Sequence, residues 1–403
     1  MPSQRLEFVP DHDAELFTAA PARAAVFVLR GDEGSDPYIG KTANLRRRLQ
    51  RLLGAADGLG RKLNLRDRVH AVEWTPTGSD FEASLLLYKT IRREFPKTYE
   101  ARLRFRFAPL VKLILDNRYP RATVTTRISG RKSNSQYFGP FPTRVAAEKF
   151  ANDSLDFFKM RRCTDDLNPD PAFPGCIYSE MKMCLAPCFK GCSDEEYTAE
   201  VERVQQYFAS GGQSLVREIA RQRDDSSAGL DFEGAAALHV RLDKVKAAAA
   251  RLPEIVRRLD ELNGVLIQPS AEADSVALFK IAAGRIADPV RLDVASKAEA
   301  AHMQARPQSM EARITEALAA VEAPKLQSAL EWMEHLALLK RWYYRTVKTG
   351  ELFLADSKGE LPMRRVVRGV SRVFKGEKPT GDLSETAGDY WKFRALEGGV
   401  KPG

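Results

Sequence analysis

Four of the five cysteines in this chain lie within 26 residues, and this cluster restricts the possible folds more than any other feature. Cys163, Cys176, Cys184 and Cys188 follow the spacing C-x12-C-x7-C-x3-C. Four thiolates are soft ligands that can enclose zinc or an iron–sulfur cluster. Structural zinc sites generally use two short cysteine pairs, and only one pair here is that close, so the spacing favours a cluster and leaves zinc as the alternative.

Two other interpretations of the cysteines stay open. Disulfides are typical of oxidising compartments, but five cysteines cannot all pair, and Met1–Asp13 is charged and lacks the apolar segment of a signal peptide. Ordinary buried thiols have no reason to gather in one segment. Cys184 and Cys188 are four residues apart, so one helical turn would direct both sulfurs to the same side. Cys192 falls outside the pattern and is interpreted as a spare thiol.

The length of 403 residues suits two to four domains, and no apolar run approaches the roughly 18 residues that span a membrane. We therefore expect a cytoplasmic protein without a membrane partner. The net charge of +9 is uneven, because residues 1–162 hold 30 Lys and Arg against 18 Asp and Glu. Residues 101–162 alone hold 14 against 4, a net charge of +10. A local basic field of this kind indicates a polyanionic partner such as DNA, with a merely solvated surface as the alternative.

Hydrophobic patterns near the N-terminus predict a hairpin that leads into a basic helix. Ala24–Leu29 and Pro37–Gly40 are short strand candidates separated by a Gly- and Pro-containing turn. Lys41–Leu53 has leucines on one helical face and arginines around it. Val69–Trp74 predicts another strand, and Phe81–Arg93 a helix capped by Ser79 or Asp80.

This stretch resembles the GIY-YIG nuclease domain that opens UvrC, the incision subunit of bacterial nucleotide excision repair. The second half of that family's motif, Y-[IV]-G-K-x-x-N-L-x-x-R-L, is present from Tyr38 to Leu49. The resemblance implies that Tyr38, Lys41 and Arg48 hold a phosphate, and Arg46, Arg47 and Arg51 on the same helix are candidate DNA contacts. Phosphodiester hydrolysis also needs a base, a divalent metal and cations that stabilise the developing charge.

Two expected catalytic groups are replaced in this sequence. The resemblance places the base, a tyrosine in the family, at Phe27, and the metal-binding glutamate of the later helix at Leu87. Leucine cannot bind a hard cation, which requires oxygen ligands. Glu82 and Glu94 lie nearby but are not obvious substitutes. Mg²⁺ or Mn²⁺ is therefore expected only if the nuclease site is active. The alternative interpretation is that Tyr38 and Gly40 merely build a hairpin.

The resemblance to UvrC continues through three further segments. Tyr137–Pro142 (YFGPFP) matches its YFGP segment, and the four cysteines match, in order, a region understood to hold a 4Fe-4S cluster. Leu230–Leu238 matches the UVR motif through which UvrC meets the helicase subunit UvrB, although His239 and Val240 replace its Arg-Asp. The implied partner contacts are Phe232, Leu238 and Leu242. An ordinary amphipathic helical hairpin is the alternative interpretation of this stripe.

The sequence as a whole predicts an α+β protein in which the resemblance ends near residue 292. Beyond that point we recognise no counterpart of UvrC's RNase-H-like or helix-hairpin-helix domains, only helices near 311–321 and 325–344 and a basic tail. The expected segments are a small GIY-YIG-like α/β domain (20–100), a basic DNA-contacting linker (101–162), a Cys-rich region (163–192), an α-helical UVR-like region (193–252), a small β segment (253–292) and a helical C-terminal region (293–403).

Two functions remain in competition at this stage. In the first, the protein is an excision-repair endonuclease that makes a single-strand incision. In the second, it is a catalytically inactive adaptor that binds DNA and recruits a UvrB-type helicase. Tyr38, Lys41 and Arg48 are compatible with both functions, whereas Phe27 and Leu87 favour the adaptor.

Overall fold

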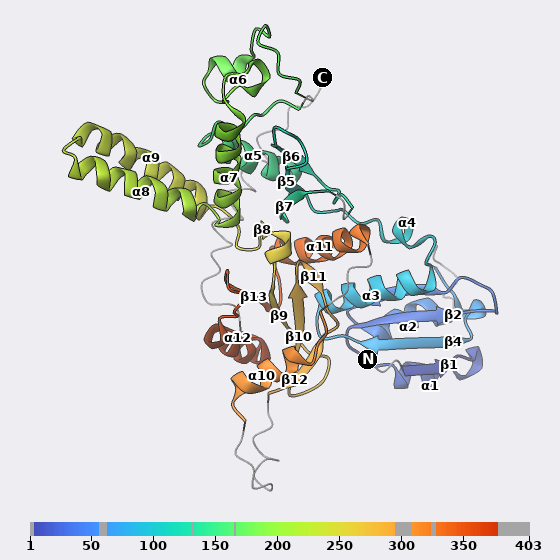
Figure 1. Cartoon of the computed structure of the whole chain (residues 1–403). Coiled ribbons are helices and arrows are strands. Elements are labelled where there is room, and N and C mark those ends of the chain that lie inside the picture. Colours follow the sequence, from blue (N-terminus) through green and yellow to red (C-terminus); the bar gives the residue numbers. More distant parts are fainter. Residues whose placement is uncertain are drawn as a thin grey trace, which may run out of the picture.

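The computed structural model describes residues 4–55, 63–130, 133–164, 167–294, 308–323 and 328–377. Helices are mixed with three separate antiparallel sheets, and one helical hairpin projects from the body (Figure 1). This arrangement agrees with the predicted mixture of helix and sheet. Within these residues, no helix is both long and apolar enough to cross a membrane.

The first sheet has the strand order β1-β4-β2-β3 and carries helices on both faces. Its strands are β1 (Gln4–Glu7), β2 (Ala25–Arg30), β3 (Tyr38–Thr42) and β4 (Ala71–Pro76). Helices α1 (Asp13–Ala19) and α2 (Leu45–Leu53) bury their leucines against one face, together with Phe27 and Trp74. Helix α3 (Asp80–Glu94) lies on the opposite face, as alternation along β2 requires.

Local capping explains where these helices begin. Helix α2 starts at Leu45, four residues after the expected start, because β3 continues to Thr42 and the Asn44 side chain accepts the Arg47 backbone N–H. Helix α3 starts after Ser79, whose hydroxyl accepts the Glu82 N–H, as predicted. Strand β1 and helix α1 were not predicted.

The second sheet, of order β6-β5-β7-β8, joins the basic segment to the middle of the chain. It contains β5 (Leu110–Ile114), β6 (Arg121–Thr125), β7 (Ser135–Gly139) and β8 (Arg257–Arg258). The short helix α4 (Tyr99–Leu103) precedes it, and α5 (Arg144–Leu155) packs against β5 and β6.

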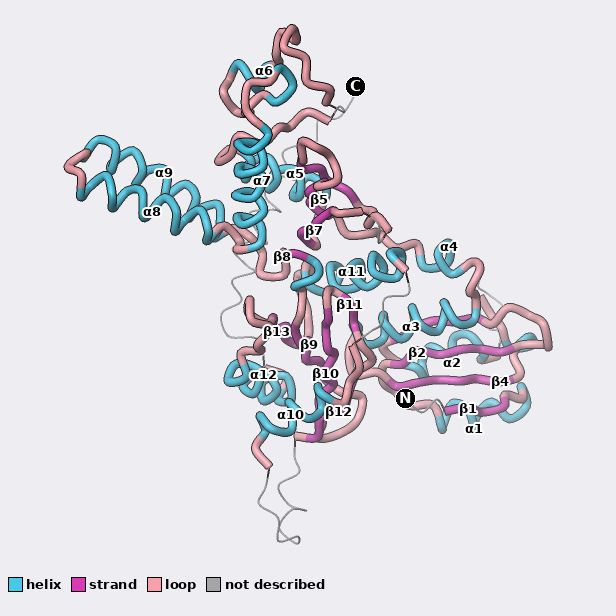
Figure 2. The backbone as a smooth tube through the Cα atoms, in the orientation of Figure 1, coloured by secondary structure: helices cyan, strands magenta, loops and turns pink. Residues whose placement is uncertain are grey.

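Three long helices follow the cysteine-rich loop, which itself contains the short helix α6 (Ile177–Glu180). They are α7 (Asp194–Ala209), α8 (Gln213–Ala228) and α9 (Phe232–Ala250). The predicted capping box of Ser193 and Glu196 starts α7. Gly211 and Gly212 separate α7 from α8 with φ of 58° and 90°, a region that favours glycine. Helices α8 and α9 pair as the projecting hairpin (Figure 2).

The third sheet has the order β11-β10-β9-β13, with β12 paired to β10. Its strands are β9 (Gly264–Pro269), β10 (Ser275–Ala282), β11 (Arg285–Ile286), β12 (Val290–Asp293) and β13 (Glu351–Leu354). Helices α10 (Met310–Ala319) and α12 (Met363–Lys375) cover the face that contains Val265 and Ile267. Helix α11 (Ala329–Tyr343) belongs to the core on the face of Leu266.

One sheet therefore combines strands from both sides of residue 292. β13 pairs with β9, although the sequence places these strands in the 293–403 and 253–292 segments respectively. A continuous core then links α3, the second sheet, α7 and α11. At the α3–α11 contact, the Tyr88 hydroxyl donates to the fully buried Glu334 carboxylate at 2.7 Å. This core connects the first sheet to the remainder of the molecule.

Candidate functional site

Tyr38 and Arg48 form a close pair on the α2 face of the first sheet. An Arg48 guanidinium nitrogen donates to the Tyr38 hydroxyl at 2.7 Å, and both side chains are partly buried. Strand β3 presents Tyr38, and α2 returns over the same face to present Arg48. The pair offers a hydroxyl and a cation of the kind that can contact a phosphate oxygen.

Lys41 lies apart from this pair. It is three residues from Tyr38 in β3, so strand alternation directs the two side chains to opposite faces. The Lys41 Nζ donates to Asp80 Oδ1 at 2.6 Å and to Ser84 Oγ at 2.7 Å, both on α3. The structure therefore brings together two of the three expected phosphate-holding residues, and the third is already paired with a carboxylate.

Phe27, in the position expected for the catalytic base, is a core residue. Its side chain is 1% exposed and lies between Gly40 on β3 and Trp74 on β4 in the strand register. A Cβ added at Gly40 would lie 3.2 Å from the Phe27 ring edge, so glycine allows the ring to approach β3. At this position the motif serves hairpin packing, and Phe27 has no hydroxyl that could take a proton.

The carboxylates near the expected metal position have other partners. Leu87 is partly buried and packs against the main core. Glu82 is 3% exposed and accepts the Gly78 backbone N–H at 2.6 Å. Burial raises the pKa of Glu82, although the Gly78 hydrogen bond works in the opposite direction. Glu82 thus anchors the loop before α3.

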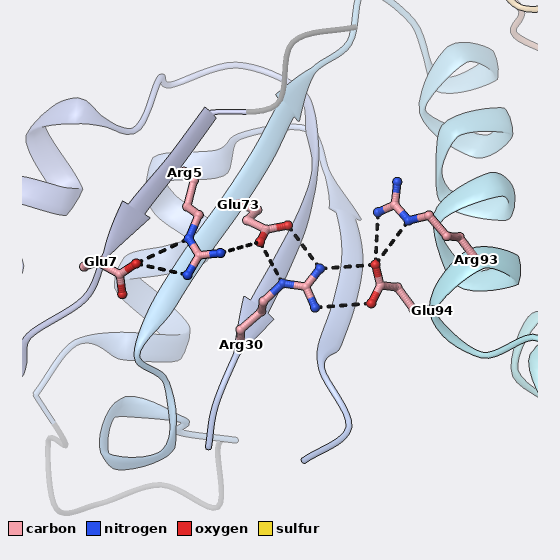
Figure 3. A network of polar contacts seen from close by, with 6 residues as sticks. All are labelled: Arg5, Glu7, Arg30, Glu73, Arg93 and Glu94. Carbon is pink, nitrogen blue, oxygen red and sulfur yellow. Dashed lines mark hydrogen bonds and ion pairs between the residues drawn. The ribbon is translucent and has the colours of Figure 1, made fainter. Parts of the chain in front are cut away.

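Glu94 belongs to an ion-pair network that crosses the sheet (Figure 3). Arg30 on β2 contacts Glu94 at 3.1 Å and Glu73 on β4 at 2.7 Å, and Arg93 also reaches Glu94 at 3.0 Å. Arg5 extends the network from β1 to Glu73. The Arg30 hydrogen bond lowers the pKa of Glu94. Both possible substitute carboxylates are therefore committed to structural contacts.

The three arginines of α2 that were predicted to contact DNA differ in whether they are already bound within the molecule. Arg46 donates to the Ala20 and Thr18 carbonyls at 2.9 and 3.2 Å and so attaches α1 to α2. Arg47 and Arg51 are exposed and have no ion-pair partner among the described residues. Of the three predicted DNA contacts, only these two present a free cation.

The basic segment 101–162 is partly neutralised within the molecule. Arg161 is 1% exposed and donates to the Tyr119 carbonyl at 2.9 Å. Five other cations form ion pairs with carboxylates: Arg102, Arg118, Arg144, Lys149 and Arg162. Three arginines in the described part of the segment are exposed without such a partner: Arg104, Arg106 and Arg127. Three of these carboxylates, Glu148, Asp153 and Asp156, are already subtracted in the net charge of +10, so carboxylates from outside the segment neutralise only Arg102 and Arg118.

The four cysteines occupy one region as free thiols. Cys184 and Cys188 do not share a helical turn, because Ala186 between them adopts φ of 57° and a short 3-10 turn begins at Pro187. Burial raises the pKa of Cys184 to about 11, and the nearby thiols of the other three add to this rise. The Ala186 N–H donates to the Cys184 sulfur at 3.3 Å. Still, no three Cys, His, Asp or Glu side chains of the described residues form a metal-binding group.

The hairpin of α8 and α9 divides the predicted apolar stripe into two parts. Leu242 is 1% exposed and belongs to the core that links α3, α7 and α11. Leu238 is partly buried and packs against that core. Phe232 is 65% exposed near the tip, beside the exposed Leu230. Only the tip part of the stripe is therefore available to a partner.

Sequence reasoning missed the groups that occupy the expected catalytic region. Asp80 holds Lys41, and Arg30 holds Glu94, across gaps of 39 and 64 residues. The Arg30 position at the end of an apolar strand was a usable signal, because a charge there needs a partner from another element.

Comparisons with known proteins identify the middle of the chain. Residues 110–207 match the family described as "UvrC/Cho excinuclease, middle domain". The "UvrABC system protein C" of Kocuria rhizophila is 28% identical over 280 residues, which cover 66% of this chain and 39% of that protein. Those of Alcanivorax borkumensis and Trichlorobacter lovleyi are 28% and 30% identical, covering 56% and 54% of this chain and 37% and 35% of those proteins.

This chain spans about two fifths of the length of the curated relatives it matches. No solved structure matches it. The predicted resemblance is confirmed at this level: the chain is UvrC-like over part of its length, and residues 110–207 match the middle domain of the UvrC/Cho excinuclease family.

Proposed function

We propose that this protein acts in nucleotide excision repair as a DNA-binding, UvrC-type adaptor whose GIY-YIG-like domain does not cut. One observation favours the adaptor over the nuclease. Phe27 and Leu87 stand where the base and metal ligand are expected, while Glu82 and Glu94 are held by Gly78 and by arginines. Without a base or an oxygen ligand, the site lacks two of the three requirements for hydrolysis.

DNA binding is supported by the cations that remain free after internal pairing. Arg47 and Arg51 on α2 and Arg104, Arg106 and Arg127 in the basic segment are exposed. Such contacts position a phosphate backbone without reading bases, so the proposed binding is strongly salt-dependent and shows little sequence preference. This role requires access to chromosomal DNA and fits a cytoplasmic location.

Partner recruitment is assigned to the tip of the projecting hairpin. An exposed aromatic side chain on a helix can insert into an apolar groove of a partner, and Phe232 is the aromatic residue available there. We propose a UvrB-type helicase subunit as that partner. Leu242 supports the hairpin from within, because it is buried against the body.

The cysteine-rich loop is proposed to hold a 4Fe-4S cluster, with zinc as the alternative. The donor set would be four thiolates, from Cys163, Cys176, Cys184 and Cys188. Their proximity is supported by the electrostatic effect of the other three thiols, which raises the pKa of Cys184. The Ala186 N–H that donates to sulfur is the type of outer contact that such sites use. The cluster would join the four cysteines of the loop and stabilise this part of the fold.

A cleavage assay tests the central proposal. The purified protein is incubated with nicked and lesion-bearing duplex DNA and Mg²⁺ or Mn²⁺, and binding is measured in parallel. The adaptor proposal expects binding without cleavage. Metal-dependent cleavage that Arg48→Ala abolishes would instead establish the nuclease, with which the retained Tyr38–Arg48 pair is also compatible.

A further inference from the structure

We propose that α12 carries a second surface for the phosphate backbone of nucleic acid, in the part of the chain that follows the UvrC-like region. This surface, the basic face of α12, consists of Arg364, Arg368 and Lys375. The inference rests on the proposed function in naming DNA as the ligand, but it concerns residues to which neither the motifs nor the family match assigns a role.

The sequence of α12 separates charge from apolar side chains around the helix. Its 13 residues include five Arg or Lys and no Asp or Glu. Val366, Val370 and Val373 are buried against the third sheet. Arg364, Arg368 and Lys375 are separated by four and seven residues, so they share the opposite, exposed face. The face extends about 16 Å along the helix.

Close packing fixes the orientation of this face. Gly369 rests on β13, where an added Cβ would lie 2.4 Å from the Phe353 ring. Arg372 forms two hydrogen bonds to the nearly buried Glu351 carboxylate, at 2.7 and 2.6 Å. These contacts prevent rotation of α12 and hold the basic face toward solvent without requiring a partner.

The electrostatic arrangement of α12 is unfavourable for the helix alone. Arg364 and Arg365 lie in the first turn, where the helix dipole disfavours cations and where no acidic residue compensates. Arg364 and Arg368 are like charges one turn apart, a spacing that destabilises a helix. In the described part of the chain neither forms an ion pair, and Lys375 lies 3.9 Å from Glu377. By contrast, Arg291 on β12 of the same sheet and Arg258 on β8 of the second sheet each contact two carboxylates. A polyanion would remove this repulsion.

The buried face of α12 distinguishes nucleic acid from a membrane as the polyanion. A helix that lies on a membrane needs a free apolar face to insert below the headgroups. The valines of α12 are already covered by the sheet, and only Phe374 is appreciably exposed, at 39%. A row of cations with one partly exposed apolar neighbour suits a phosphate backbone, which presents dense charge and requires no insertion.

Salt-dependent binding of the full chain to a fluorescent duplex tests this inference. The variant Arg364→Gln/Arg368→Gln is compared with wild type, with Arg364→Lys/Arg368→Lys, and with the charge-matched control Arg258→Gln/Arg291→Gln. Each phosphate contact contributes about 0.9 to the slope of log K against log salt, so the glutamine variant should lower the slope by about 1.8. The lysine variant and the control should retain the wild-type slope. Because both replaced arginines are exposed, thermal unfolding should remain unchanged.

The outcomes separate this inference from the proposed function. If wild type binds DNA and the glutamine variant keeps its slope, the inference is overturned and the proposed function stands. If wild type binds no DNA at any salt concentration, both fail. Binding to phosphatidylserine vesicles, lost in the glutamine variant while the DNA slope is unchanged, would assign the basic face to lipid and overturn the inference.

Discussion

Restoring the two missing catalytic groups should convert the first domain into a nuclease. The variant Phe27→Tyr/Leu87→Glu supplies a hydroxyl and a carboxylate at the positions where the family resemblance expects them. Loss of general-base assistance costs roughly 10²–10⁴ in rate, and the missing metal adds to this cost. We therefore expect wild-type cleavage to be at least about 100-fold slower than cleavage by the double variant in Mg²⁺ or Mn²⁺.

The structure also predicts the stability cost of this change. The Phe27 ring is 1% exposed, so a new hydroxyl without a partner should lower the free energy of unfolding by about 1–3 kcal/mol. Leu87 is only partly buried, so its replacement should cost less than the roughly 2–5 kcal/mol typical of truncating a buried leucine. Urea unfolding, followed by circular dichroism, measures both effects and shows that the variant tested for cleavage is folded.

Single-turnover nicking of a labelled duplex provides the rate. Adding Arg48→Ala to the double variant should remove the gained activity, because Arg48 holds the Tyr38 hydroxyl on the same face of the sheet as residue 27. A folded double variant that does not cut would show that the two positions are not arranged as in the family. Rapid cutting by the wild-type protein would refute the reasoning more directly, since it would require Glu82 or another carboxylate to bind the metal.

Three further predictions concern the rest of the molecule. Glu94→Gln should lower the free energy of unfolding by about 0.5–1 kcal/mol at pH 7. Because the folded-state pKa of Glu94 lies below 4.5, this difference between variant and wild type should be complete above pH 4.5 and should disappear as the pH falls through the folded-state pKa. A difference in urea unfolding that stays constant as the pH is lowered from 7 through that pKa would contradict this. Phe232→Ala should weaken binding to a UvrB-type subunit by about tenfold in a calorimetric titration without changing the melting temperature. Leu242→Ala should instead destabilise the protein by about 2–5 kcal/mol, because Leu242 is buried. Unchanged binding by the folded Phe232 variant would show that the tip does not recruit the partner. Cys184→Ser should reduce the iron and sulfide content of anaerobically purified protein, with Cys192→Ser as the unaffected control, and one zinc per chain in the wild type would select the alternative metal.

Local patterns were sufficient to predict most elements of the first sheet and the three long helices. Ser79 and Ser193 are capping residues whose effect depends only on the next few residues, and the structure shows both caps. The start of α2 was placed too early because Lys41–Thr42 continue β3, and a pairing with β2 decides this rather than helix propensity.

The missed features depend on contacts between distant segments. The basic stretch that contains α12 was interpreted as part of a tail, because its valines have a helical spacing whose significance depends on the sheet beneath them. At the candidate site, the roles of Glu82 and Glu94 follow from the loop at Gly78 and from the β2–β4 register, which pairs Glu73 with Val28 and so leaves it diagonal to Arg30 on the same face. No local pattern encodes that register, so the sequence identified the missing groups but not the partners of the remaining ones.

The pairing of β13 with β9 has a consequence for synthesis of the chain. Strand β9 contains Val265, Leu266 and Ile267, all fully buried, and without β13 one of its edges would expose unpaired backbone groups. About 80 residues separate the two strands, which at roughly 5–20 residues per second corresponds to about 4–16 s of translation. During that interval the β9 edge of the nascent chain is unpaired and can form strand pairs with other chains. A chain that ends before Glu351 would therefore be prone to aggregate through this edge.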